Sequence, residues 1–135
     1  MKKTVFISFI LIVFTCATAI AQSITIKDGN YNIRLRIDGD IVKDGNYNIV
    51  GRIDGNIIKD GSYRIIARID GDVIKDESYN IIGRIDGNTI KDRNYNIIGR
   101  IDGNVIKNEN YSIVARIDGS PRRSQLIAIL YFFVL

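Results

Sequence analysis

The chain has 135 residues and a formal net charge of +4 at pH 7, and it contains no histidine. The absence of histidine removes the usual base of hydrolytic triads. Basic and acidic residues recur together along the chain, which does not predict the one-sided basic surface that nucleic-acid binding needs. We therefore expect no catalytic residues, no cofactor, no enzyme activity and no nucleic-acid partner.

Residues 1–21 have the three-part layout of a cleavable signal peptide. The start is basic, Val5 to Thr15 is an apolar run, and Ala19-Ile20-Ala21 supplies the small residues of a cleavage site. Cys16 follows a threonine, whereas a lipoprotein signal prefers glycine or alanine there. The pattern therefore predicts export without lipidation. Loss of Lys2 and Lys3 leaves 17 basic against 15 acidic residues, a mature net charge of +2.

A repeat of 16 residues without insertion or deletion fills residues 22–119, and such repeats are sought before single motifs. Tyrosine, Asp-Gly and lysine each keep this period over six copies. The tyrosines are Tyr31, Tyr47, Tyr63, Tyr79, Tyr95 and Tyr111.

Each copy contains two extended segments, as in residues 47–54 and 56–59. Apolar residues alternate along the longer segment with the period of two that is typical of a strand. This alternation predicts that Tyr47, Ile49 and Ile53 point into the core. In the shorter segment, the position of Ile58 is always β-branched and aliphatic, so we expect it to be buried too.

Two kinds of turn join these segments. The predicted structural turn residues are Asp54-Gly55, Asp70-Gly71 and Asp86-Gly87, which suit a two-residue hairpin of type I′. The second connection is a three-residue loop such as Asp60-Gly61-Ser62. Its first residue is expected to bond its own backbone two residues on, and its third to adopt the left-handed conformation.

The predicted fold is all-β, with two-strand hairpin repeats arranged radially in a closed ring; an open β-solenoid is the alternative. A copy of 16 residues cannot bury its own apolar face, so neighbouring copies must cover it. The chain opens with a short segment, Ile24 to Lys27, and ends its repeats with a long one, Tyr111 to Asp118. Pairing of these two segments would close the ring and remove its free edges.

The tandem run from Ile49 to Asp60, I-V-G-R-I-D-G-N-I-I-K-D, resembles that of the five-fold β-flower proteins of bacteria. The likeness extends from about Ile24 to Gly119 and implies a radial display of short hairpins. It brings no catalytic residues with it. This chain has six copies, which does not fit strict five-fold closure. The sixth copy would either close a six-fold ring or serve as a cap.

Residues 120–135 form a polar linker and an apolar tail that runs from Leu126 to Leu135. Ten apolar residues are too few for a membrane-spanning helix. We expect the tail to pack on the repeat domain, and membrane contact through 126–135 is the alternative, with Arg122 and Arg123 at the lipid headgroups.

Three groups of side chains are candidates for binding. Asp38, Asp40, Asp70 and Asp72 are weak calcium candidates, although a complete calcium loop is missing. The six arginines, of which Arg52 is one, are expected to pair with aspartates or to grip a polyanion or glycan. The six tyrosines would pack into the ring or stack on carbohydrate, and the shared apolar face favours packing.

The sequence thus predicts an exported, non-enzymatic structural or binding protein of the bacterial cell envelope, in the periplasm, at the surface or outside the cell. Its ligand would be a glycan or a cell-surface polymer. The alternative is a self-assembling surface or matrix component, because identical repeats of high β propensity can stack edge to edge.

Overall fold

The computed structural model describes residues 23–135, which form twelve strands followed by one helix. The predicted signal peptide, residues 1–21 with Cys16, lies outside the described residues. The elements are β1 (Ile24–Lys27), β2 (Ile33–Asp38), β3 (Ile41–Asp44), β4 (Ile49–Asp54), β5 (Ile57–Lys59), β6 (Ile65–Asp70), β7 (Val73–Lys75), β8 (Ile81–Asp86), β9 (Thr89–Lys91), β10 (Ile97–Asp102), β11 (Val105–Asn108), β12 (Ile113–Asp118) and α1 (Arg123–Phe133).

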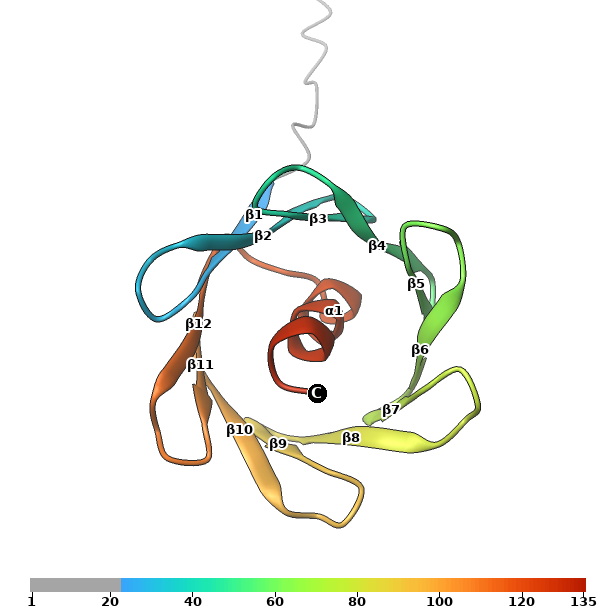
Figure 1. Ribbon diagram of the computed structural model, residues 1–135. Coiled ribbons are helices and arrows are strands. Elements are labelled where there is room, and N and C mark those ends of the chain that lie inside the picture. The colour runs from blue at the N-terminus through green and yellow to red at the C-terminus, as the bar shows by residue number, and fades with distance from the viewer. Residues whose placement is uncertain (1–22) are drawn as a thin grey trace, which may run out of the picture.

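The strands form one closed antiparallel ring in which each strand pairs with its neighbours in sequence, and β1 pairs with β12 (Figure 1). At this seam Thr25 lies opposite Asp118 and Ile26 opposite Ile117. The β4–β5 hairpin has the same register, with Asp54 opposite Ile57. The two ends of the repeat region therefore form a sixth hairpin that lacks only its connecting turn. The predicted closed ring is confirmed, and it has six hairpins.

A β-bulge in every long strand decides which side chains face inward. In β4, Gly51 lies opposite Val42, but the next residue paired with β3 is Ile49, opposite Lys43, so Val50 is the extra residue. A shift of one residue moves the following side chain to the opposite face. Ile49 is therefore 39% exposed, while Val50 packs partly against the core.

Two of the four predicted core residues are thus wrong. Ile49 is turned outward by the bulge, and Tyr47 lies before the strand in the loop, where it is 64% exposed. Ile53 and Ile58 do lie in the core, at 5% and 0% exposure. The residues equivalent to Ile58 in other copies, Val42, Ile74, Ile90 and Ile106, are also fully buried.

The tight turns differ from the prediction by one residue. Asp54 is the last residue of β4 and pairs with Ile57, so Gly55 and Asn56 are the two loop residues. Gly55 has φ +57°, and Asn56 is not among the residues with positive φ. Glycine with positive φ at the first loop position alone is the requirement of a type II′ turn, not of type I′. The same positive φ recurs at Gly71 and Gly87.

The apolar tail fills the interior of the ring. Helix α1 lies along the axis, enclosed by the strands (Figure 1). Its side chains Ile127, Ala128, Ile129 and Leu130 are completely buried. Packing of the tail on the repeat domain is therefore what the structure shows. Over residues 23–135, no helix has the length and apolar character needed to cross a membrane.

The tail also explains the glycine in the middle of three long strands, Gly51 in β4, Gly83 in β8 and Gly99 in β10. A Cβ added at Gly51 would lie 3.2 Å from the Phe132 ring, and one at Gly83 would lie 2.6 Å from Leu135. The close neighbours are side chains at the end of the tail, although a Cβ at Gly51 would also lie 3.2 Å from Val42.

The start of the tail is fastened to one rim of the ring. Gln125 is 95% buried; its Nε2 donates to the Gly39 carbonyl over 2.8 Å, and its Oε1 accepts the Arg122 N–H over 2.8 Å. The Arg122 guanidinium contacts Asp40 at 2.8 Å, and that of Arg123 contacts Asp72. These bonds satisfy the buried amide and fix the point at which the tail enters the ring.

We predict that Leu130→Ala destabilises the protein by about 2–5 kcal/mol, because the cavity left in the centre of the ring cannot collapse fully. Urea unfolding followed by far-ultraviolet circular dichroism measures this loss. Leu135→Ala is the matched control, since Leu135 is 36% exposed and should cost less. Equal losses for the two variants would contradict the buried position of the helix.

Candidate functional site: a belt of stacked tyrosines and arginines

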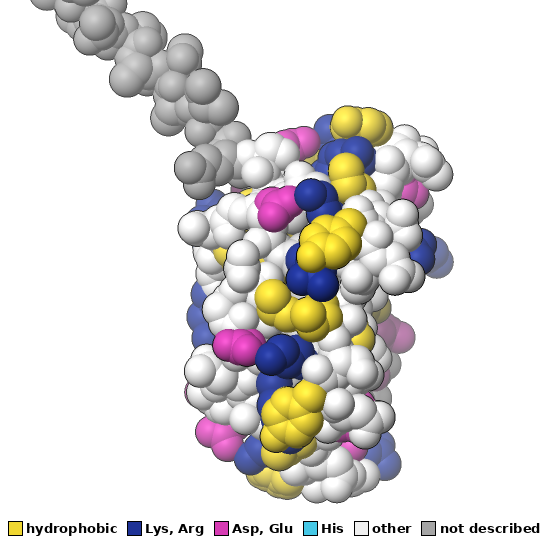
Figure 2. Space-filling view, turned by 90° about the vertical axis from the view of Figure 1, so that its left-hand side faces the viewer, with side chains coloured by type: hydrophobic (Ala, Val, Ile, Leu, Met, Phe, Trp, Pro, Cys, Tyr) yellow, Lys and Arg dark blue, Asp and Glu magenta, His cyan; other side chains and the backbone are white. Residues whose placement is uncertain are grey.

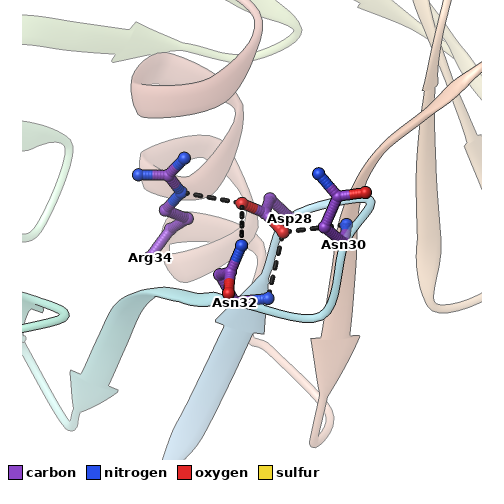
Figure 3. Close-up of polar contacts among 4 residues, drawn as sticks. All are labelled: Asp28, Asn30, Asn32 and Arg34. Atoms are coloured by element: carbon purple, nitrogen blue, oxygen red, sulfur yellow. Dashed lines mark hydrogen bonds and ion pairs between the residues drawn. The ribbon is translucent and has the colours of Figure 1, made fainter.

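An aspartate organises five of the six three-residue loops, and Asn108 takes its place in the last. In the first copy, Asp28 Oδ1 accepts the backbone N–H groups of Asn30 and Asn32, at 2.9 and 3.0 Å (Figure 3). Its Oδ2 accepts from the Asn32 side chain and from Arg34 Nε. The predicted bond from the first loop residue to the backbone two residues on is therefore present. These backbone bonds, that of Asn32 first, hold the pKa of Asp28 below its ordinary value.

The left-handed residue of each loop is tyrosine, not the asparagine or serine that we predicted. Tyr63 has φ +67°, and its N–H donates to the Asp60 carbonyl over 3.2 Å. This is the pattern of a type I turn followed by a left-handed residue at a bulge, so the loop lies one residue further along the chain than expected. The left-handed conformation costs about 1–2 kcal/mol for a residue other than glycine. Something must therefore hold the tyrosine there.

Stacking with arginine holds it. The Arg52 guanidinium lies over the Tyr63 ring, 4.1 Å from the ring centroid. A cation over an aromatic face at this distance contributes about 0.5–2 kcal/mol, which is comparable to the cost of the backbone conformation. The same stack occurs six times, at 4.1–4.4 Å, in the pairs Arg36–Tyr47, Arg52–Tyr63, Arg68–Tyr79, Arg84–Tyr95, Arg100–Tyr111 and Arg116–Tyr31.

These stacks correct two predictions. The tyrosines do not pack in the ring; they are 64–66% exposed. The six stacking arginines are not paired with the strand-end aspartates, because lysine takes that place, as in Lys59 with Asp54 at 3.0 Å. The equivalent pairs join Lys27 to Asp118, Lys43 to Asp38, Lys75 to Asp70, Lys91 to Asp86 and Lys107 to Asp102.

The arginine–tyrosine stacks and the lysine–aspartate ion pairs together line a surface hollow that recurs along the repeats. One hollow of about 240 Å³ is bounded by Arg68, Asp70, Lys75, Tyr79 and the turn residue Asn56. Two further hollows, of about 230 and 210 Å³, are lined by the equivalent residues around Tyr111 and Tyr95, with Asp72 in place of the turn asparagine at Tyr95. Figure 2 shows hydrophobic side chains, the class that includes tyrosine, alternating with basic ones in a band across the face of the molecule. We call the six tyrosine–arginine stacks and the lysine–aspartate pairs beside them the belt.

The weak calcium candidates already have cationic partners. Asp38 pairs with Lys43 and Asp70 with Lys75, while the rim residues Asp40 and Asp72 pair with the two arginines of the tail. Within residues 23–135, no group of three or more histidine, cysteine, aspartate or glutamate side chains could hold a metal ion. The arrangement therefore gives the calcium hypothesis no support.

The sequence contained a signal for the stacks that we did not use. Five of the six belt arginines are followed by a tyrosine 11 residues later, as Arg68 is by Tyr79. The sixth, Arg116, stacks on Tyr31 across the seam between β12 and β1. A strand that turns back through one hairpin brings these two positions together. The signal is hard to recognise, because the bulge and the left-handed tyrosine break the simple alternation.

We predict that Asp60→Asn preserves the fold at pH 7 but removes part of its acid sensitivity. The Arg64 backbone N–H is the largest cause of the lowered pKa of Asp60, whose ordinary value is 3.8. Because the pKa of Asp60 is lower in the folded than in the unfolded protein, its ionised carboxylate stabilises the folded state above about pH 4. This stabilisation is lost as the pH falls through the pKa of the folded state. Asparagine keeps the side-chain oxygen that accepts the backbone N–H groups, but it has no group that titrates. Asn108 already has this role in the last copy, where its Oδ1 accepts the backbone N–H groups of Asn110 and Ser112.

Melting temperatures at pH 7 and pH 3 measure this effect. Asp60→Asn should lose less on acidification than the unchanged protein, and Asp60→Ala should melt at a lower temperature already at pH 7. Equal destabilisation by Asp60→Asn and Asp60→Ala at pH 7 would contradict the role of the Asp60 side chain as a hydrogen-bond acceptor in the loop.

Comparison with known proteins identifies the family. The comparisons with curated proteins and with solved structures found no match. A family model described as "5-fold beta-flower protein" matches residues 20–134, which include the tail as well as the repeats. The ring described here has six hairpins, one more than that description states. The chain belongs to the five-fold β-flower protein family.

Proposed function

We propose that this chain is an exported, non-enzymatic binding module of the bacterial cell envelope, and that the belt binds an extended carbohydrate polymer. The observation that carries the proposal is the row of six exposed tyrosines. Each ring has one face under an arginine while the residue remains 64–66% exposed, so its other face is open to solvent.

The chemistry of the hollows suits carbohydrate. An open aromatic face can stack on the C–H face of a sugar ring, and nearby polar groups can bond its hydroxyls. The hollow at Tyr79 offers Asn56 and the Asp70–Lys75 pair for this purpose. Pockets that combine an apolar surface with a few fixed polar groups are typical ligand sites.

Repetition around the ring suits a polymer better than a single small molecule. Linked sugars can occupy several weak sites at once, and this raises the overall affinity well above that of one site. Export rests on the predicted signal peptide alone. The self-assembly alternative is less favoured, because the closed ring has no unpaired strand edge among its twelve strands.

Electrophoresis of the folded protein through native gels that contain soluble polysaccharides tests the proposal. The panel is dextran, xylan, polygalacturonate and solubilised peptidoglycan. We predict that at least one polymer retards the protein. A variant with Tyr47→Asn, Tyr79→Asn and Tyr111→Asn should bind about tenfold more weakly, since half of the linked sites are lost.

Asparagine is chosen because it tolerates the left-handed conformation, so the loops are retained. Tyr131→Phe is the control, since Tyr131 belongs to the tail helix and not to the belt. Circular dichroism verifies that each variant is folded. Equal retardation of the triple variant and the control, or no retardation by any polymer, would contradict the proposal.

A further inference from the structure

We propose that the belt selects acidic saccharides, with a sugar carboxylate bound at the basic groups of a hollow while the sugar ring stacks on its tyrosine. This inference rests on the proposed function and names the class of polymer. Three observations carry it: the local charge of the hollows, the environment of the arginines, and the place of the tail arginines.

The hollows at Tyr111 and Tyr79 each have one more positive than negative side chain. In the hollow at Tyr111, Arg100 and Lys107 face Asp102 alone, and the remaining polar lining residues, Asn88 and Thr89, are neutral. The Lys107–Asp102 pair at 2.8 Å neutralises itself. The charge of Arg100 is therefore left for a ligand. The hollow at Tyr79 has the same balance, with Arg68 as the uncompensated cation.

The belt arginines are held in place and partly withdrawn from water. The Nε atoms of Arg52, Arg68, Arg84 and Arg116 are buried and have no hydrogen-bond partner within the described residues. A cation that is partly shielded from solvent attracts an anion more strongly than a fully hydrated one does. Because the tyrosine ring already fixes the guanidinium, binding a carboxylate orders few additional torsions.

The tail keeps the net positive charge of the hollows in the two copies that have an aspartate at the turn. The turn position that is Asn56, Asn88 and Asn104 in three copies is Asp40 and Asp72 in two others. The hollow at Tyr95 contains Asp72, which would cancel its net positive charge. Arg123 pairs with Asp72, and Arg122 pairs with Asp40. The two arginines at the start of the tail thus neutralise the two aspartates, so that both positions are as uncharged as the asparagines of the other copies.

The test compares two ligands with the same sugar backbone, one charged and one neutral: a polygalacturonate fragment of defined length and its methyl ester. Binding is measured through the intrinsic tyrosine fluorescence of the full chain, which has no tryptophan. We expect the acid to bind at least tenfold more tightly than the ester. Its affinity should fall when salt rises from about 0.05 to 0.5 M, because screening weakens contacts between exposed charges.

The tail supplies a matched pair of variants. Arg123→Gln should weaken binding of the acid about twofold to fivefold, because Asp72 is then unpaired in its hollow. Adding Asp72→Asn to this variant should restore the binding, since asparagine occupies that position in other copies. The melting temperatures of both variants are measured as well. If Arg123 had only a structural role, adding Asp72→Asn would not restore binding of the acid while the melting temperature stayed the same.

The two proposals fail in different ways. If the ester binds as tightly as the acid, or if neither binds while a neutral polymer of the panel does, the acidic specificity is overturned and carbohydrate binding stands. If no polymer binds, both proposals are overturned. Binding of the acid that is independent of salt and of Arg123 would also overturn the inference.

Discussion

The pairing of β1 with β12 is the constraint on which the rest of this structure depends. It joins segments from opposite ends of the repeat region, yet it repeats the contacts of an internal hairpin. Ile26 lies opposite Ile117, and Lys27 pairs with Asp118 at 2.9 Å. The stack of Arg116 on Tyr31 also crosses this seam. Because the repeat region starts with the short strand β1 and ends with the long strand β12, closure needs no specialised element. Once the ring is closed, its inner face becomes a lumen of fixed width that the apolar tail fills.

The belt follows from the way that neighbouring hairpins are joined. An aspartate in five loops, and Asn108 in the last, accepts backbone N–H groups. The tyrosine of the same loop adopts a left-handed conformation at the bulge. This conformation directs the ring outward, where an arginine of the preceding long strand, as in Arg52 of β4 over Tyr63, covers one of its faces. Exposed aromatic rings in a strained backbone conformation are unusual. Here stacking offsets the strain and leaves six rings available on the surface.

Much of the fold could be predicted from the period of the repeat. The period predicted the strands and the seam, since paired antiparallel segments with no free edge are the simplest solution for such a sequence. It placed the tight turns to within one residue but with the wrong turn type. The inward position of Ile58 followed from its restriction to β-branched aliphatic residues. The outward position of Ile49 did not follow, because a bulge of one residue reverses the face without changing the composition.

The candidate site was harder to predict, for related physical reasons. Alternation placed Tyr47 on the apolar face, but the strand begins only at Ile49, so the alternation does not reach the tyrosine. The position of the tail depended on contacts distant in sequence. Two signals were present: a small residue in the middle of most long strands, and aspartate in place of asparagine at positions 40 and 72. The second could be interpreted only once Arg122 and Arg123 were seen beside these aspartates.

Disulfide trapping at the seam is the most direct measurement of closure. Thr25 and Asp118 are opposed residues of β1 and β12, and opposed Cα atoms in antiparallel strands lie about 4.5–5.5 Å apart, within the range of a disulfide. The chain without its predicted signal has no other cysteine. Closure predicts that the Thr25→Cys, Asp118→Cys variant forms an intramolecular disulfide in the monomer under mild oxidation, while Thr25→Cys with Asp70→Cys does not. Free thiols or disulfide-linked dimers in the seam variant would contradict a closed ring.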